Sequence, residues 1–533
     1  MYLPTALFRC LAVPHRRWSK SNNKTPPKPK SNQDNGPPIL KLPPDVLELC
    51  WGYLRRPDLF HVSCVCRVFW RTSRFIIFRS LIINLSSPPM LPLNQKLVLR
   101  STKKYSNMLE PATTRVTSFY SDPDARELWD IVQAWTVTAP LSALNTFSPF
   151  RVQKHEQTLA LRPVDVVFQL LSFSRNLRSL ELARLDLGRE QWVILQSLPA
   201  LESLRLISCF FSSSSHLEPL KLKGLEIAGG SFSPRSIDGY LVYVLCNPAY
   251  LEKLTLIDSF VAPTALEALS SMEHFPHLSH LSVLVKPSSR GHFLRFLAAI
   301  PSLTILNIFP SSVDITPDHP LPVLSSLRSY NGYPHLLSRL VPGRPVDRVC
   351  LVLQVVTASN QPDDYTFHAD LVSNMLDISC STVPVRRLKI DCFLPTLQRL
   401  SAIARYLPDL HFLDLVLISA SPLLIPEDSV ISSSFEDLDY ASNPLNSHDT
   451  MRGLLSWLAA GRAPLPPELQ TLRLSYSPGW SNNVQSLERN QQCEMIYCLH
   501  DRYPSLCEVE MGDCRWWREG ADWSREILDF GEI

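Results

Sequence analysis

Thiols and imidazoles near the end of the chain are the first candidates for a metal site. Cys493, Cys498 and His500 lie close together and Cys507 follows them. Cysteine thiolate and histidine imidazole are the usual ligands of structural zinc, but this spacing fits no standard zinc pattern. Cysteines are also commonly buried as small apolar residues. We therefore predict no metal site and no bound cofactor.

Residues that could act in catalysis are equally sparse. Cys64 and Cys66 are two positions apart in an apolar segment, a spacing that points their side chains to different faces of a helix. The sequence contains no glycine-rich phosphate loop, no His-Glu-x-x-His motif and no Gly-x-Ser-x-Gly motif. The sequence therefore predicts a protein that is not an enzyme.

Composition narrows the classes of partner and compartment. The chain has 533 residues, of which 45% are hydrophobic, and its 52 basic and 50 acidic residues nearly cancel. That balance favours neither nucleic acid nor an anionic membrane as the main partner. No apolar stretch reaches the roughly 18 residues that a membrane-spanning helix needs. The 13 widely spread cysteines are typical of reduced thiols, which predicts the cytoplasm or the nucleus.

The first 38 residues differ from the rest of the chain. Every charged residue before Asp34 is a lysine or an arginine, and prolines are frequent between residues 26 and 38. This composition favours a disordered basic tail. Two targeting functions stay open, a mitochondrial presequence and a weak nuclear import signal at residues 24–30.

The segment from Leu42 to Leu85 must form the first helices. Its apolar residues recur at helical spacing in two runs, and Pro57 and Asp58 interrupt the pattern between them. Asp58 is expected to cap the second helix through its side-chain oxygen. The apolar residues of the two runs are Val46, Leu47, Cys50, Trp51 and Leu54, then Leu59, Val62, Cys66, Phe69 and Trp70. So small a unit with so much apolar surface suggests a partner.

This segment resembles an F-box, the adaptor-binding module of cullin–RING ubiquitin ligase receptors. The residues that carry the resemblance are Leu42-Pro43, Asp45, Leu47, Leu54, Asp58-Leu59, Val65-Cys66-Arg67 and Phe69. Two positions depart from the family pattern, since Cys50 stands where isoleucine is usual and Phe69 where tryptophan is usual. The resemblance implies binding to a Skp-type adaptor, and through it to cullin and RING subunits. The adaptor-binding residues that it implies are Leu42, Pro43, Leu47, Leu54, Leu59, Val65 and Phe69.

Beyond residue 170 the chain repeats a short motif, an apolar residue followed by Leu-x-Leu or a similar triplet. Copies begin at Leu177, Leu201, Leu222, Leu251, Leu278 and Leu303, a poor copy begins at Leu324, and later copies begin at Val346, Val385, Leu410, Leu469 and Leu506. Most spacings fall within the roughly 20–29 residues of leucine-rich repeats. Each Leu-x-Leu predicts a short strand, and helical patterns lie between strands at residues 290–299 and 397–407.

The predicted fold is therefore α/β. A short all-helical F-box precedes a curved leucine-rich-repeat solenoid of short parallel strands, with helices or irregular segments outside. The expected organisation is a tail at 1–38, the F-box at 39–85, a linker and entry cap at 86–170, the solenoid at 171–515 and a C-terminal cap or tail at 516–533. Residues 122–135 are expected to form a helix in the linker, and residues 422–448 to be a loop insertion.

The strand residues that alternate with the inward leucines are the candidates for binding a protein substrate. They include Arg205, Lys253, His280, Arg387, Lys389, Phe412, Asp414 and Arg473. A solvated sheet face of mixed charge is the alternative reading of the same residues.

Together these patterns resemble the F-box and leucine-rich-repeat receptors, the substrate-recognition subunits of SCF-type ubiquitin ligases. The resemblance implies that the F-box docks on the adaptor while the repeats hold an unidentified substrate for ubiquitination. Two alternatives stay open, a non-catalytic scaffold outside any ubiquitin ligase and a mitochondrial repeat protein.

Overall fold

The structure of the chain is a computed structural model. It describes residues 39, 42–77, 79–84, 131–138, 163–211, 218–229, 245, 247–272, 274–309, 324–352, 371–393, 395–417, 450–476, 489–520 and 522–528. The predicted tail at 1–38, the insertion at 422–448 and most of the predicted helix at 122–135 lie outside these residues.

Three short helices form the first described element group, which we call the helical module (residues 44–77). They are α2 (Pro44–Gly52), α3 (Arg56–Ser63) and α4 (Arg67–Ile77). Pro44 begins α2, where a missing N–H costs nothing. The predicted cap at Asp58 is wrong, because Asp58 lies inside the first turn of α3 and receives a hydrogen bond from Arg55 Nε at 3.2 Å. A carboxylate in that turn still interacts favourably with the helix dipole.

The rest of the described chain is a mixed α/β structure built on an open, mostly parallel sheet of sixteen strands. The chain divides into two compact units, the first covering residues 1–251 and 255–268 and the second residues 252–254 and 269–533. In the first unit the strand order is β1 (Ser80–Asn84), β2 (Ala134–Thr138), β3 (Ser179–Ala183), β5 (Ser203–Ile207) and β7 (Gly224–Ala228). Strands β1 and β2 were not predicted. Strand β1 follows the repeat motif at Phe78, Leu81 and Ile83, within the segment assigned to the F-box, and β2 follows it at Val132, Trp135 and Val137, with tryptophan in place of a leucine. The predicted helix at 122–135 is therefore wrong at its end, where residues 134 and 135 begin β2.

The second unit continues the same arrangement. After β8 (Lys253–Leu256), whose residues are divided between the units, its parallel strands follow in chain order. They are β9 (His280–Leu284), β10 (Ile305–Phe309), β11 (Ser329–Gly332), β12 (Arg348–Val352), β13 (Arg387–Phe393), β14 (Phe412–Leu417), β15 (Thr471–Tyr476) and β16 (Glu508–Met511). Two further short strands, β4 (Asp186–Leu187) and β6 (Phe210–Phe211), pair separately.

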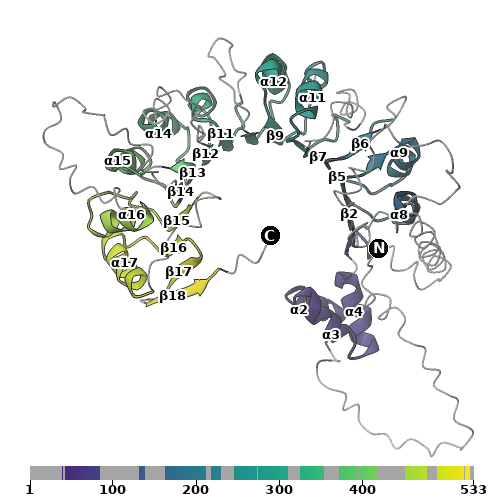
Figure 1. The fold of residues 1–533 in the computed structure, drawn as a ribbon, viewed down its shortest axis with the longest axis horizontal. Helices are drawn as coiled ribbons and strands as arrows, with labels where there is room; N and C mark the ends of the chain where they lie inside the picture. The colour runs from purple at the N-terminus through teal and green to yellow at the C-terminus, as the bar shows by residue number, and fades with distance from the viewer. Residues whose placement is uncertain are drawn as a thin grey trace, which may run out of the picture. The chain divides into compact units, whose positions relative to one another are not determined.

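Helices cover one face of the strands within each unit. In the first unit they are α8 (Pro163–Leu171), α9 (Arg189–Gln196) and α11 (Val261–Ser270). In the second they are α12 (Arg290–Ala298), α13 (Leu337–Leu340), α14 (Leu371–Ser379), α15 (Leu397–Tyr406), α16 (Thr450–Ala459) and α17 (Arg489–Arg502), with 3-10 turns at Pro287–Ser289 and Pro334–Leu336. Figure 1 shows α12, α14 and α15 along the same face of their unit's strands. The helices predicted at 290–299 and 397–407 are confirmed.

The core forms because strand side chains alternate. In β9 and β10 every second residue is buried and the residues between are partly exposed. The parallel register places Leu281 beside Leu306 and Val283 beside Ile308, so equivalent residues of neighbouring strands make continuous apolar rows. Phe296 of α12 is fully buried and meets Phe275 edge to face, with ring centroids 5.1 Å apart. We call the opposite side of the strands, which carries the partly exposed residues, the open face.

The poor repeat copy at Leu324 is in the wrong register. Tyr330, and not Leu327, is the partner of Leu306, so the repeat runs Leu327, Tyr330 and Gly332. Tyr330 is fully buried, and its hydroxyl donates to the Tyr333 carbonyl at 2.7 Å. A β-carbon at Gly332 would lie 2.8 Å from that hydroxyl, so glycine is needed beside the large ring. The Leu-x-Leu motif could not find this strand because Tyr and Gly replace both leucines.

The sheet ends in an antiparallel hairpin of β17 (Cys514–Glu519) and β18 (Asp522–Ile527). Strand β17 pairs with β16, and the hairpin buries Trp516 and Trp523. The solenoid was predicted to run to residue 515, but the hairpin already begins at Cys514. The turn that contains Gly512 ends β16 and reverses the chain before that residue.

Candidate functional site

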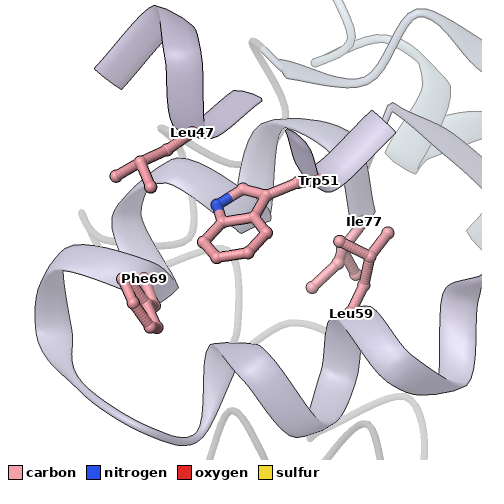
Figure 2. Packing of buried hydrophobic residues seen from close by; sticks show 5 residues of the cluster. All are labelled: Leu47, Trp51, Leu59, Phe69 and Ile77. Atoms are coloured by element: carbon pink, nitrogen blue, oxygen red, sulfur yellow. The ribbon is translucent and has the colours of Figure 1, made fainter. Parts of the chain in front are cut away.

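The helical module has its own small core. Five buried side chains, Leu47, Trp51, Leu59, Phe69 and Ile77, pack together between the three helices (Figure 2). The Trp51 and Phe69 rings meet edge to face with centroids 5.1 Å apart. Trp51 Nε1 donates a hydrogen bond to Thr72 Oγ1 at 3.0 Å, so the indole is satisfied inside the module. Leu81 of β1 and Ile131 pack against the same core.

The outer surface of the module is also apolar. Val46, Leu49 and Tyr53 recur at helical spacing along α2, and the last two are 65% and 84% exposed. Val65 is 69% exposed in the turn before α4, and Val68 and Phe75 of α4 are exposed as well. Helix α2 is therefore apolar on two faces, one in the core and one in contact with water. An exposed apolar surface of this kind is typical of a site for another protein.

The residues that the sequence proposed for adaptor binding divide between these two faces. Leu42, Pro43 and Val65 are exposed and accessible to a partner. Leu54 is partly buried against the core. Leu47, Leu59 and Phe69 are buried, so a partner could touch them only if the module opened. Val46 and Cys50 were expected on the same apolar stripe as Leu47, but both are exposed while Leu47 is buried. The exposed apolar residues that were not proposed for adaptor binding could have been found from the second apolar stripe along α2 and α4; they are Val46, Leu49, Tyr53, Val68 and Phe75.

A groove of about 710 Å³ lies beside the module. Glu48 of α2, Arg74 and Phe75 of α4, Arg79, and Gln133 next to β2 are among the residues that line it. Arg79 Nε donates to Gln133 Oε1 at 3.1 Å. The groove therefore adjoins the exposed apolar surface and could receive a side chain of the same partner.

On the open face of the first unit, the charge of Arg205 is balanced by two glutamates of the neighbouring strands. The guanidinium donates to Glu226 Oε1 of β7 at 2.9 Å and to Glu181 Oε2 of β3 at 3.1 Å. Two carboxylates thus flank one arginine in adjacent strands, which leaves Arg205 little excess charge to offer a substrate.

A longer series of alternating charges crosses the open face of the second unit. Lys389, Asp414, Arg473, Glu510 and Arg515 stand at equivalent positions of β13 to β17, so each charge faces the opposite charge on the next strand. The series includes an Arg473–Glu510 ion pair at 3.0 Å, and beside it Lys389 pairs with Asp391 at 3.1 Å. Opposite charges at directly facing positions stabilise a sheet.

The pKa values of this series reflect its burial. Burial raises the pKa of Asp414, although Lys389 and Arg473 oppose the shift. Burial alone would lower the pKa of Lys389, but its hydrogen bond and charge interaction with Asp391 raise it. Lys389 therefore stays charged at neutral pH.

Phe412 of β14 lies between two guanidinium groups. The carbon of the Arg473 guanidinium is 5.1 Å from the ring centroid and that of Arg387 is 5.8 Å from it. Both distances fall within the range of cation–π attraction. Arg387, Lys389, Phe412, Asp414 and Arg473 are thus the predicted residues that the structure brings together, on β13 to β15.

Lys253 and His280 form a separate pair of predicted residues on β8 and β9. Burial lowers the pKa of His280, and the nearby Lys253 charge lowers it further. Its Nδ1 is 2.7 Å from the Ser279 hydroxyl. A neutral imidazole that already has a hydrogen-bond partner offers a polar contact rather than a charge.

The thiols and imidazoles show no assembled reaction centre. In the described part of the chain, no group of three or more His, Cys, Asp or Glu residues is placed to hold a metal ion. His500 instead contacts the Trp523 ring edge to face, with centroids 6.0 Å apart. Burial raises the pKa of Cys209 and of Cys350 to about 12, so neither thiol ionises near neutral pH. Cys209 Sγ donates to the Leu182 carbonyl at 3.2 Å and acts as a structural residue.

None of the helices in the described part of the chain is long and apolar enough to cross a membrane.

Comparison with known proteins adds no relative. No family model matches the chain, and no curated protein matches it at a significant level of similarity.

Proposed function

We propose that this protein is a substrate-recognition subunit of an SCF-type ubiquitin ligase. In this proposal the helical module is an F-box that binds a Skp-type adaptor, and the repeated strands and helices are a leucine-rich-repeat solenoid that binds a protein substrate. The reaction occurs on other subunits, and this chain contributes proximity by holding substrate and adaptor together.

The exposed apolar surface of the helical module is the observation that carries the proposal. One apolar face of α2 packs into the core of the module and needs no partner. The other apolar face leaves Leu49 and Tyr53 exposed to water. Such a surface is stabilised when a partner covers it. The Leu-Pro start, the Asp-Leu pair and the Val-Cys-Arg triplet, in register with three helices, indicate which partner.

The open face supports the second half of the proposal. Within each unit it offers rows of partly exposed side chains on parallel strands, as repeat proteins do for protein ligands. The substrate-binding candidates on β13 to β15 share one continuous part of it.

Adaptor binding is the direct test. The purified chain is expected to bind a purified Skp-type adaptor, and a Leu42→Ala, Pro43→Ala double variant to lose co-purification. Val65→Asp should weaken binding by about 30-fold, the effect of losing one central contact of about 2 kcal/mol. The matched control is Val193→Asp, at an exposed valine of α9. Undiminished binding by both module variants would sink the F-box assignment.

Addition of a purified cullin–RING pair to the adaptor complex distinguishes a ubiquitin ligase receptor from a scaffold outside any ligase. Assembly into one complex and ubiquitination of a captured protein are expected. Adaptor binding without cullin recruitment would instead favour a scaffold outside the ligase. Mitochondrial location of a fluorescent fusion that depends on residues 1–38 would favour the mitochondrial alternative.

A further inference from the structure

One pair of facing residues on the open face breaks the rule of alternating charge. Arg348 of β12 and Arg387 of β13 are directly opposite in the parallel register. Every other facing pair of two charged residues in the described parallel strands joins opposite signs, as at Glu181–Arg205 and Asp414–Arg473. Like charges at facing positions destabilise a sheet. The two arginines therefore weaken the fold at this point.

Two more arginines increase this local excess of positive charge. Arg328 and Arg386 immediately precede β11 and β13 and are exposed, as Arg348 and Arg387 are. Backbone hydrogen bonds join these positions across the strands, from Arg348 N–H to the Arg328 carbonyl at 3.2 Å and from Arg387 N–H to the Asp347 carbonyl at 3.1 Å. Asp347 supplies the one ion pair of the group, with its Oδ1 3.7 Å from Arg348 Nε. We call these four residues the arginine patch (Arg328, Arg348, Arg386 and Arg387).

The patch has defined limits on both sides. Strands β9 and β10 place His280, Ser282, Ile305 and Asn307 at the equivalent open-face positions, and burial keeps the histidine neutral. On the other side the balanced series with Asp414 begins. A long polyanion such as nucleic acid would therefore leave the patch on that side and meet carboxylates.

We propose that the arginine patch binds an acidic segment of a protein substrate, rich in aspartate and glutamate. Guanidinium groups pair well with carboxylates, and among the described residues the four arginines share a single ion pair, between Arg348 and Asp347. Strands stand about 4.8 Å apart, so the four side chains start from points spread over about 10 Å instead of surrounding one anion. Such a spread suits several charges along an extended peptide, which advances about 3.3 Å per residue. At that spacing about four residues span the roughly 10 Å of the patch.

This inference rests on the proposed receptor function and names its substrate class. The test is fluorescence anisotropy of the full chain with a labelled twelve-residue peptide that carries six Asp and Glu residues. Binding that weakens with salt is expected, and Arg348→Gln, Arg387→Gln should reduce affinity by roughly tenfold, the effect of two exposed ion pairs. The matched control is Arg175→Gln, Arg178→Gln, which removes the same charge from exposed positions just before β3.

A stability measurement distinguishes a binding role from a structural one. Because the two facing arginines repel each other, the patch variant should unfold at the same or a higher temperature than the wild-type protein while it binds the peptide less well. Equal binding by both double variants, or no binding of the acidic peptide at low salt, would overturn the proposal.

Three further ligands in the same anisotropy experiment test which kind of anion the arginine patch prefers. A glutamine version of the peptide should not bind. Preferential binding of a phosphoserine peptide without binding of the Asp and Glu peptide, or tighter patch-dependent binding of a single-stranded oligonucleotide, would overturn the assignment to acidic protein segments. Peptide binding needs no adaptor, so failure here and failure of adaptor binding are separate results.

Discussion

Asp414 shows how closely charge and burial are balanced at single residues of the open face. Its carboxylate stands between strands that carry Lys389 and Arg473, yet the net effect of its surroundings is a raised pKa because burial outweighs the two cations. Ionisation of Asp414 is therefore harder in the folded chain than in the unfolded chain. Asp414 continues the alternation of charges across the strands, but its ionised carboxylate does not add to the free energy of unfolding at neutral pH.

We expect Asp414→Asn to raise the unfolding temperature at pH 7. A raised folded-state pKa stabilises the fold only at low pH, and the contribution is lost as the pH rises through that pKa. The advantage of the variant should therefore shrink toward pH 4 and below, where the carboxyl of the wild-type protein is protonated. Thermal unfolding at both pH values measures this, with Asp409→Asn at an exposed site as the control. A variant less stable than wild type at pH 7 would contradict the burial argument.

Single residues also show where sequence reasoning stopped. Apolar spacing identified Leu47, Leu59 and Phe69 correctly as apolar helix residues, but it could not say whether they face the module core or a partner. The answer depends on how three helices pack. Likewise, Arg387 could be singled out from the sequence, whereas its position opposite Arg348 follows only from the register of two strands 39 residues apart in the chain.

At the scale of elements, helix ends depend on a few backbone positions. Gly461 lies just after the end of helix α16 and has a φ of +68°, which an L side chain rarely adopts. Gly461 N–H donates to the Leu458 carbonyl at 3.0 Å, and Arg462 N–H to the Trp457 carbonyl at 2.9 Å, the two bonds of a Schellman cap. The guanidinium of Arg502 lies over the glycine, where a β-carbon would have to stand.

Gly461→Ala should destabilise the second unit by about 1–2 kcal/mol, about 1 kcal/mol from the left-handed backbone and the rest from displacement of Arg502. Gly343→Ala is the matched control, since its φ is +73° and nothing lies within 4 Å of the added carbon. The control should show the backbone cost alone. Denaturant unfolding of both variants measures the difference, and a smaller loss at Gly461 than at Gly343 would exclude the Arg502 contact.

The elements themselves were largely predictable because one signal recurs. Leu-x-Leu after a spaced apolar residue found β3, β5 and most later strands, since each repeat needs the same inward side chains. The signal failed where the chemistry of the core changed, at Tyr330 with Gly332 and at Trp135 of β2. Trp135 and Val137 alternate with partly exposed residues, but Leu128, Trp129, Val132 and Trp135 also fit a helix, and the two patterns compete. Strand β1 carries the motif within the segment that resembles an F-box.

For the whole molecule, the hairpin of β17 and β18 protects the last parallel strand. Without it, β16 would present unpaired backbone groups and a bare core where Trp516 and Trp523 now lie. An exposed hydrophobic strand edge is a common route to aggregation. The outermost strand is instead rich in charge, with Asp522, Arg525 and Glu526.

Removal of residues 513–533 is therefore expected to lower the unfolding temperature by several degrees and to produce aggregates on size-exclusion chromatography. Removal of 529–533 alone leaves the hairpin intact and should leave both measurements unchanged. A monodisperse protein with an unchanged unfolding temperature after the longer deletion would show that the hairpin does not protect the sheet.

Because strand order in the sheet follows chain order, each parallel strand finds its neighbour in the next repeat of the chain. Contacts that are local along the sequence form quickly, and a nucleus can extend one repeat at a time in either direction. During synthesis at roughly 5–20 residues per second, each new repeat can therefore dock on the one already folded. The hairpin is made after the parallel strands, so the growing edge stays open until β17 and β18 have left the ribosome, and that interval is when a chaperone would be needed most.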